Sequence, residues 1–324
     1  MSTLPSESKG DLTYGQMREV TEERASSSDA PKAKEGNEYI YNGQKLEIRD
    51  VWADNLEEEM KVVREVVVNY NCVAMDTEFP GVVARPVGSF EETPDYQYQT
   101  LRCNVDLLKL IQLGLAFTNE KGELVPGCPC WQFHFKFSLQ DDMYAQDSID
   151  LLVRSGIDFE KHEKNGIDVQ DFGEALISSG LVLMKGVKWI SFHSGYDFGY
   201  LVKLLTCQPL PSDEDTFFEL LSQYFPCIYD VKHLMTKVEG GKVFHGGLNR
   251  LAEQLGVDRV GPMHQAGSDS LLTALVFFEL ERSYFNSSCD TYVPGSIGTI
   301  HGLGKKGTEA GEWITSSNGT TFLG

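Results

Sequence analysis

Apolar residues near the start of the folded part recur first at the spacing of a helix and then as a continuous run. Between Leu56 and Val67 they fall three or four positions apart, which predicts an amphipathic helix capped by Asp54 or Asn55. The run CVAM at residues 72–75 follows almost at once and predicts a buried strand. A helix followed by a strand is therefore the first pair of elements that we expect.

Two more strands are expected in the next sixty residues. A helix through residues 101–108 leads to a predicted strand over residues 110–117. Aromatic and polar side chains then alternate strictly over residues 131–137, which predicts a strand with one aromatic face and one polar face. We expect the aromatic face to be core rather than a platform for RNA. Three strands in this order predict an antiparallel meander.

Helical spacing dominates the second half of the chain, interrupted by two short strands. The strands are predicted at residues 188–192 and 227–229. Helical segments are expected over residues 143–180, broken by glycines, and over residues 196–205, 213–224, 248–255 and 266–284. This order predicts an α/β fold, in which a mixed sheet with an antiparallel meander and parallel strands is flanked by helices.

Polar segments flank this pattern at both ends. Residues 1–45 and 286–324 are rich in small, polar and charged side chains, and we expect both to be largely disordered. One folded domain is then expected over residues 46–285. No run reaches the roughly 20 apolar residues of a membrane helix, and the first residues show no apolar segment typical of a secretory signal. Seven scattered cysteines, an odd number, favour a reducing compartment.

The net charge of −20 adds a constraint on the ligand. Only −3 of this charge falls in residues 1–50, so the acidity belongs to the folded part. Proteins that bind nucleic acid without regard to sequence usually present a basic surface. Either nucleic acid is not the ligand, or it binds locally at acids that metal ions neutralise.

The buried strand at residues 72–75 runs directly into two acids in the segment VAMDTEFPG. Side chains two residues apart on a strand share one face, so Asp76 and Glu78 point the same way while Thr77 points opposite. Two carboxylates this close repel each other unless a cation lies between them. A site for Mg²⁺ or Mn²⁺ explains the pair, and a solvated pair of acids at a strand end explains it equally well.

Two further acids occur where a loop leads into a helix. Asp197 follows the predicted strand at 188–192 in the segment FHSGYD, and an acid in the first turn of a helix is also explained by the helix dipole. Asp269 begins the helix of residues 266–284, five residues after His264, and His-x4-Asp alone carries almost no information. His193 is interpreted as a loop residue that forms hydrogen bonds.

Taken together, the Asp-x-Glu, the single Asp and the His-x4-Asp resemble the histidine-bearing (DEDDh) subgroup of the DEDD exonuclease superfamily, whose sheet is RNase H-like. Longer segments resemble one branch, the Caf-one/Pop-two deadenylase family, a nuclease subunit of the Ccr-four–Not complex. The resemblance extends from about Ile48 to Phe285 and is carried by MDTEFPGVVARP, LRCNVDLLKLIQLGLAF, DMYAQDSIDLL, WISFHSGYDFGYLVKLL, YDVKHLM and GPMHQAGSDSLLT.

The resemblance implies a 3′→5′ exoribonuclease that uses two divalent metal ions, Mg²⁺ or Mn²⁺, to shorten mRNA poly(A) tails and release 5′-AMP. Its site residues carry over to Asp76, Glu78, Asp197 and Asp269 as metal ligands. His264 is implied as the general base, a role that suits a histidine whose pKa lies near neutrality. Phe79 could stack on a terminal base of poly(A) RNA or could belong to the core.

The resemblance also implies partners and a location. The partners would be the Not scaffold protein, a Ccr-four-type nuclease with leucine-rich repeats, and adaptors of the Tob/BTG kind. The location would be the cytoplasm, with some protein in the nucleus. Two alternatives remain open: a DEDDh exonuclease that acts on DNA or structured RNA, and an inactive scaffold, although all four acids are present.

Overall fold

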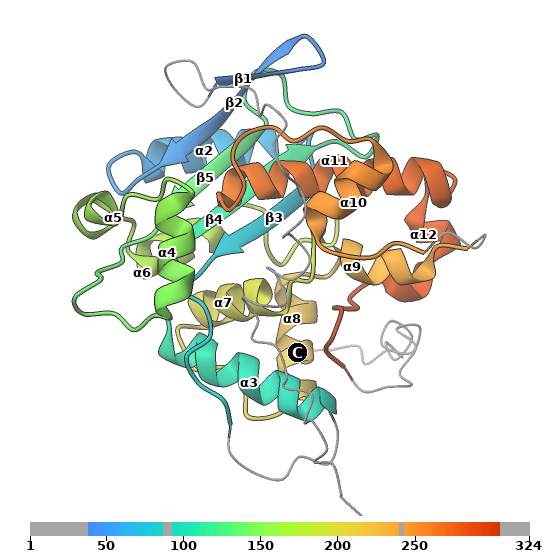
Figure 1. The fold of residues 1–324 in the computed structure, drawn as a ribbon. Helices are drawn as coiled ribbons and strands as arrows, with labels where there is room; N and C mark the ends of the chain where they lie inside the picture. Colours follow the sequence, from blue (N-terminus) through green and yellow to red (C-terminus); the bar gives the residue numbers. More distant parts are fainter. Residues whose placement is uncertain (1–37, 87–92, 240–242, 305–324) are drawn as a thin grey trace, which may run out of the picture.

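A computed structural model describes residues 38–86, 93–239 and 243–304, which form a seven-stranded mixed sheet between two layers of helices (Figure 1). The strand order across the sheet is β1-β2-β5-β4-β3-β6-β7. The strands are β1 (Glu38–Tyr41), β2 (Gln44–Val51), β3 (Cys72–Glu78), β4 (Gln112–Thr118), β5 (Cys130–His134), β6 (Lys188–Ser191) and β7 (Ile228–Asp230). This confirms the predicted mixed sheet flanked by helices.

The predicted meander forms the middle of the sheet. Antiparallel pairing joins β3 to β4 and β4 to β5, and parallel pairing adds β6 to β3 and β7 to β6. The polar face predicted for residues 131–137 is buried within β5, because helix α11 (Ala266–Tyr284) covers Gln132 and Trp52 stacks on His134. Every residue of β3, β4 and β5 is buried, so side chains on these strands act in a water-poor environment.

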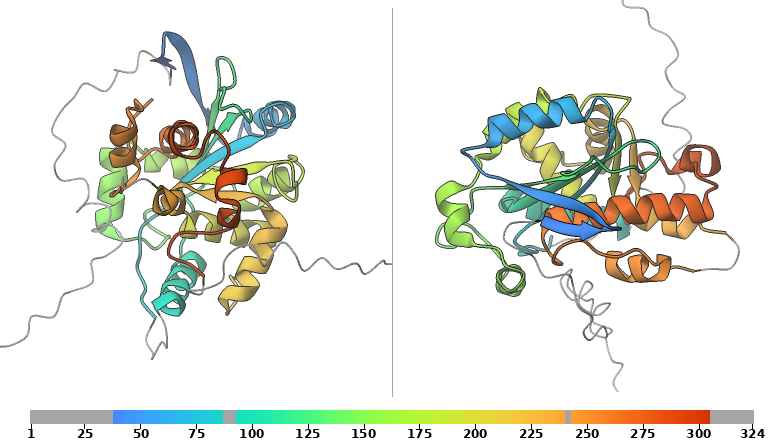
Figure 2. Two further views of the ribbon diagram at one scale, coloured as in Figure 1. Left: turned by 90° about the vertical axis from the view of Figure 1, so that its right-hand side faces the viewer. Right: turned by 90° about the horizontal axis from the view of Figure 1, so that it is seen from above.

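Helices cover the two faces of the sheet in separate layers. Figure 2 shows α2 and α11 on opposite sides of the strands, and the two hydrophobic clusters of the core divide in the same way. The layer of α2 includes α2 (Leu56–Val66), α3 (Thr93–Leu107), α6 (Val169–Ile177), α7 (Gly195–Thr206) and α8 (Glu214–Tyr224). The layer of α11 includes α9 (Val231–Leu234), α10 (Leu248–Leu255), α11 and α12 (Cys289–Tyr292).

The remaining α-helices lie beyond one end of the central strands β4 and β5. The helices α4 (Gln146–Arg154) and α5 (Phe159–Asn165) pack on a small cluster around Phe137. The short 3₁₀ helices η1 (Met235–Lys237) and η2 (Pro294–Ser296) complete the elements of the described residues. No helix in the described ranges is long and apolar enough to cross a membrane.

Both expected domain boundaries fall inside the ordered part of the structure. Strand β1 and the start of β2 precede residue 46, and β2 joins the sheet by parallel pairing with β5. At the other end, α12 and η2 follow residue 286, and Ile300 belongs to the core. The prediction of disorder is therefore wrong for residues 38–45 and 286–304. For residues 1–37 and 305–324 that prediction lies outside the described residues.

Candidate active site

The two acids of β3 lie on the face of the sheet that α11 covers. Asp76 and Glu78 alternate with Met75 and Thr77 along the strand, so they share a face with Ala74, which packs in the α11 layer. Both side chains are nearly inaccessible, with Asp76 8% and Glu78 2% exposed. A solvated pair at a strand end, the alternative left open by the sequence, does not describe them. Burying two carboxylates is costly unless a positive charge compensates them.

The beginning of α11 reaches these acids because β4 carries a glycine opposite Asp76. Gly114 pairs with Asp76 in the sheet, and a Cβ atom at Gly114 would lie 1.9 Å from the carbonyl oxygen of Ala266. A Cβ atom at Gly267 would likewise lie 2.6 Å from Ile48. The absence of side chains at both positions lets the helix backbone lie directly on the sheet. Asp269, one turn into the helix, is thereby brought to β3.

Three of the predicted residues form a buried cluster with the chemistry of a metal site. One ligand atom each from Glu78, His264 and Asp269 lies within 4.8 Å of the other two. All three side chains are buried. Carboxylate oxygens are the ligands that Mg²⁺ and Mn²⁺ prefer, so Glu78 and Asp269 fit the metal ions that the sequence predicted, with the His264 ring beside them.

The neighbours of Asp269 fix the orientation of its carboxylate. The Arg259 guanidinium lies 2.6 Å from Oδ1, and the backbone N–H of His264 donates to Oδ2 at 2.9 Å. His264 itself has a positive φ of 58°, a conformation that non-glycine residues rarely adopt. A strained residue of this kind persists only where its surroundings hold it in place.

Asp197 reaches the site from the opposite layer, at the start of α7. Its Oδ1 accepts two hydrogen bonds from Thr77, from the backbone N–H at 2.9 Å and from the hydroxyl at 2.6 Å. Thr77 is the residue between Asp76 and Glu78. Its contact therefore holds the Asp197 carboxylate against the β3 backbone between these two acids. Asp197 lies in the first turn of α7, where an interaction with the helix dipole alone would also place it. Its side chain, however, has Thr77 as a specific partner.

Asp76 and Asp197 are not members of this three-residue cluster, and two further candidates from the sequence also lie outside it. Phe79 is 8% exposed, and its ring stacks on Tyr196 with centroids 5.1 Å apart. The structure thus places Phe79 in the core, one of the two interpretations that the sequence left open. The N–H of His193 donates to Asp230 at 2.8 Å, and the ring of His193 packs edge-on against His301. It is a loop residue with hydrogen bonds, as predicted.

Sequence reasoning missed the residues that hold the acids in place. Arg259 and Thr77 were not candidates, because a single arginine in a loop and a threonine in a strand show no periodicity or motif. The sequence DTE did contain a signal for Thr77. A polar side chain on a buried strand requires a hydrogen-bond partner in the helix layer that it faces. For Thr77 that partner is Asp197 in the layer of α7.

Comparison with known proteins gives one family and several close relatives. The model of the CAF1 family ribonuclease matches residues 51–174 and 173–277. The probable CCR4-associated factor 1 homolog 7 of Arabidopsis thaliana is 54% identical over 266 residues, which cover 80% of this chain and 94% of the relative. The poly(A) ribonuclease pop2 of Schizosaccharomyces pombe is 51% identical over 261 residues, which cover 81% of this chain and 76% of the relative.

Solved structures give the same result. The Mg²⁺- and Mn²⁺-bound form of S. pombe Pop2p has a TM-score of 0.75 and 52% identity, covering 79% of this chain and 99% of Pop2p. Yeast CAF1, in a structure co-crystallised with the NOT1 MIF4G domain, has a TM-score of 0.64 and 35% identity, covering 78% of this chain and 96% of that chain. The similarity includes every segment that contributes to the buried cluster.

Proposed function

The chain belongs to the CAF1 family of ribonucleases, and on that basis we propose that it is a metal-dependent 3′→5′ exoribonuclease that shortens mRNA poly(A) tails and releases 5′-AMP. The observation that carries this proposal is the buried cluster of Glu78, His264 and Asp269, whose ligand atoms lie within 4.8 Å of one another. Asp76 and Asp197 complete the set, one on the same strand and the other bonded to Thr77.

The carboxylates of Asp76, Glu78, Asp197 and Asp269 would hold two divalent ions, Mg²⁺ or Mn²⁺, which are also the ions of the Pop2p structure. When bound, such ions supply positive charge to the phosphodiester and make water a better nucleophile. The protein prepares for them by orientation. Thr77 fixes Asp197, while Arg259 and the N–H of His264 fix Asp269, so the acids need little rearrangement.

His264 is placed to act as the general base. Its ring lies within the cluster, so one ring nitrogen can take a proton from the attacking water as the water oxygen bonds to phosphorus and the bond to the leaving 3′ oxygen breaks. His264 is 7% exposed, which keeps bulk water away from this step. Stacking of the terminal base on Phe79, the other interpretation, would require this core-packed ring to be uncovered. It would involve the Phe79–Tyr196 pair, of which Tyr196 is the more exposed member.

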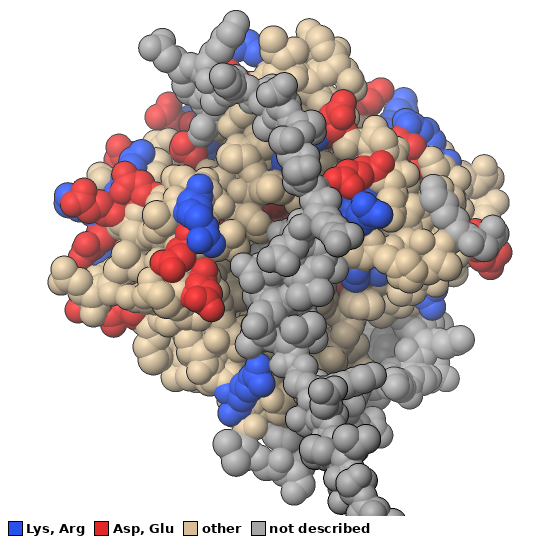
Figure 3. Space-filling model, in the orientation of Figure 1, with Lys and Arg blue, Asp and Glu red and all other residues tan. Residues whose placement is uncertain are grey.

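The acidic character of the protein suits a local mode of RNA binding. On the face shown in Figure 3, the visible acidic and basic side chains of the described residues lie in small mixed groups among uncharged residues. The net charge of −20 therefore disfavours tight binding along the RNA backbone. We propose that contact with the tail is concentrated at the metal centre, and that partners supply the effective concentration for repeated cleavage.

The proposed partners are the Not scaffold protein, a Ccr-four-type nuclease with leucine-rich repeats and adaptors of the Tob/BTG kind. Support is strongest for the Not scaffold, because a close structural relative was co-crystallised with the NOT1 MIF4G domain. The proposed location is the cytoplasm, with some protein in the nucleus. Reducing conditions there suit seven cysteines that are all free thiols.

A gel assay with 5′-labelled RNA ending in a run of adenosines tests the activity. We expect wild-type protein with Mg²⁺ or Mn²⁺ to shorten the RNA from its 3′ end and to slow at the base of the tail. Asp76→Ala should abolish shortening, whereas the matched control Asp147→Ala, at an exposed acid of α4, should behave as wild type.

The same assay separates the alternatives. Equal shortening of a DNA substrate would favour a general exonuclease. Folded, metal-supplied wild-type protein that leaves the RNA intact would favour an inactive scaffold.

A further inference from the structure

Polar side chains on the face of β3 that carries Asp76 and Glu78 continue onto β4, β5 and β2, on the same face of the sheet. Residues that pair directly across an antiparallel or parallel ladder share a face. One such row begins at Glu78 and the other at Asp76. The rows are Glu78–Gln112–His134 and Asp76–Gly114–Gln132–Asp50. The buried glutamines and His134 therefore belong, by register, to the surface that carries the proposed metal ligands.

The two glutamines of these rows bind the first backbone amides of α11. The Oε1 of Gln112 accepts from the N–H of Ala266 at 3.2 Å, and the Oε1 of Gln132 accepts from the N–H of Gly267 at 2.8 Å. The first N–H groups of a helix lack partners within the helix. The residue at the N-cap position of α11, Gln265, makes no side-chain cap, so the caps come from β4 and β5.

Gln265, the residue directly after His264, is held by the same side chains. Its Oε1 accepts from the Nε2 groups of both Gln112 and Gln132, each at 3.1 Å. Its own Nε2 donates to the carbonyl oxygen of Ser155 at 2.9 Å. The side chain next to His264 is thereby fixed from three directions.

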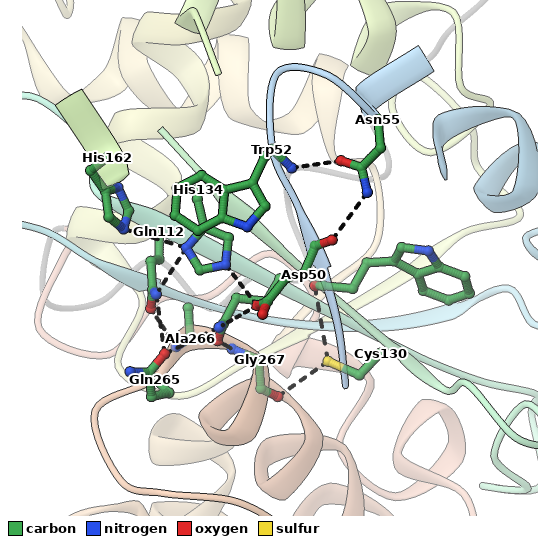
Figure 4. Close-up of polar contacts among 12 residues, drawn as sticks. Asp50, Trp52, Asn55, Gln112, Cys130, His134, His162, Gln265, Ala266 and Gly267 are labelled. Carbon is green, nitrogen blue, oxygen red and sulfur yellow. Dashed lines mark hydrogen bonds and ion pairs between the residues drawn. The ribbon is translucent and has the colours of Figure 1, made fainter. Parts of the chain in front are cut away.

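Asp50 and His134 fix the orientation of the two amides (Figure 4). The carboxylate Oδ1 of Asp50 accepts from Gln132 Nε2 at 3.1 Å and from His134 Nε2 at 2.7 Å. In the tautomer whose Nε2–H donates to Asp50, Nδ1 of His134 accepts from Gln112 Nε2 at 3.3 Å. Both glutamines are then compelled to present their oxygens, and not their NH₂ groups, to the helix.

The ring of His134 is itself immobilised at the edge of the network. Trp52 stacks on it with centroids 3.9 Å apart and planes 2° from parallel, and the Lys161 ammonium lies 4.0 Å from the Trp52 centroid. A cavity of about 600 Å³ borders this outer end and includes Asp50, Trp52 and Lys161 in its lining. The Asp50 side chain is 37% exposed. The hydrogen-bond network therefore extends from solvent at Asp50 to Gln265, next to His264.

We propose that Asp50, Gln112, Gln132 and His134 are positioning residues of the catalytic centre, which act by holding Gln265 and the first amides of α11 and so set the position of His264. The proposal rests on the function proposed above for His264. His264 has a positive φ, a conformation that persists only where neighbouring contacts hold it. The hydrogen bonds to Gln265 and to the first amides of α11 supply such contacts on the residues that follow His264.

Hydrogen exchange tests the proposal without RNA or metal. In Gln112→Met and Gln132→Met, which keep the length of the side chain, we expect the amides of residues 264–268 to exchange about five- to tenfold faster. Asp50→Asn, at the exposed end, should give a smaller increase at the same amides and disturbs the buried packing least. Gln140→Met, at an exposed loop position, is the matched control and should change nothing. Unchanged exchange at residues 264–268 in both glutamine variants would overturn the proposal.

Kinetics on an oligo(A) substrate then separate positioning from general stability. For Gln112→Met we expect kcat to fall about 10- to 100-fold, as for other residues that orient catalytic groups, with KM within about twofold. In a His264→Ala background the same substitution should cost less than about twofold, because the group it positions is absent. Equal losses in both backgrounds would show that Gln112 does not act through His264.

The two readouts distinguish this inference from the proposed function. Wild-type protein that is inactive on oligo(A), together with faster exchange in the glutamine variants, would overturn the activity while supporting the positioning of the loop.

Discussion

Two of the four acids of the candidate centre, Asp197 and Asp269, are oriented by neighbours that come from other elements. Thr77 on β3 binds Asp197 on α7, and Arg259 from the loop after α10 binds Asp269 on α11. These contacts restrict the carboxylates before any ligand arrives, which reduces the reorganisation required during catalysis. The residues that orient the acids should therefore matter for rate more than for folding.

Thr77→Val tests this at a single hydroxyl. Valine keeps the shape of threonine but removes the 2.6 Å hydrogen bond to Asp197, while the backbone N–H bond remains. We expect kcat on oligo(A) to fall about tenfold or more. The free energy of unfolding should fall by only about 1 kcal/mol. Steady-state kinetics and urea unfolding measure the two quantities. A variant with unchanged kcat would show that this hydroxyl does not orient Asp197.

His162 provides a prediction about acid sensitivity. Burial lowers the pKa of His162 from 6.5 to about 4, and its Nδ1–H donates to the carbonyl of Phe135 at 2.7 Å. The unfolded chain therefore takes up a proton at this residue before the folded chain does. Stability should fall as the pH drops from about 6.5 towards 4, with His162 accounting for roughly 2–3 kcal/mol at pH 4.5.

The test compares urea unfolding of wild type and His162→Asn at pH 7 and pH 4.5. Asparagine retains an N–H donor for Phe135 but does not titrate, so the variant should lose less stability between the two pH values than wild type. His245→Asn, at an exposed position, is the control. An equal loss in wild type and His162→Asn would contradict the prediction.

At the scale of elements, the docking of α11 on β4 decides whether the centre exists. The sheet supplies Asp76 and Glu78, but His264 and Asp269 reach them only because the helix backbone lies directly on the strand. Gly114 is the residue that allows this approach. A close backbone contact of this kind cannot relax by rotating a side chain.

Gly114→Ala should disrupt this contact. The added methyl would lie 1.9 Å from the carbonyl oxygen of Ala266, so the helix must move away from β4. We expect a loss of about 1–3 kcal/mol in the free energy of unfolding and a loss of activity that exceeds the fraction unfolded. Gly186→Ala is the control, because nothing lies within 4 Å of a Cβ atom there. Thermal unfolding and the oligo(A) assay together measure both effects, and wild-type activity in Gly114→Ala would refute this account of the docking.

The elements with strong periodicity were predictable from sequence, and those that depend on distant partners were not. The amphipathic spacing of α2 and the alternation in β5 are local signals, and both elements are present. Strand β2 has a weaker alternation at Leu46 and Ile48, with the charged Glu47 between them, and it is stabilised by parallel pairing with residues far along the chain. Its existence could not be inferred from its own residues.

The same division applies to the candidate site. The identities of Asp76, Glu78, His264 and Asp269 followed from motif order, because the chemistry restricts the residue types. The close contact at Gly114 and the caps supplied by Gln112 and Gln132 depend on cross-strand register, which a single sequence does not reveal.

For the whole molecule, the centre connects the two layers and the sheet. It draws Asp76 and Glu78 from β3, Asp197 from the layer of α7, and His264 and Asp269 from the start of α11. An ion bound by these residues binds the folded state and not the unfolded chain. Metal binding should therefore stabilise the entire domain and not only the local loop.

Thermal unfolding with and without Mn²⁺ tests this prediction. At a concentration 100 times the dissociation constant, the added stability should be about 2.7 kcal/mol, and a chelator should remove it. Glu78→Gln should abolish most of the shift, whereas Glu160→Gln, at an exposed position of α5, should retain it. A shift of equal size in wild type and Glu78→Gln would place the stabilising ion elsewhere.

The late position of α11 in the chain has a consequence for biosynthesis. Translation delivers the strand with Asp76 and Glu78 early, then Asp197, and only near the end of the described fold the loop and helix with His264 and Asp269. A nascent chain can begin to build the sheet while it emerges from the ribosome, but it cannot assemble the complete centre until α11 has emerged. The chain thus acquires its capacity to hydrolyse RNA only after the ribosome has translated the message past α11.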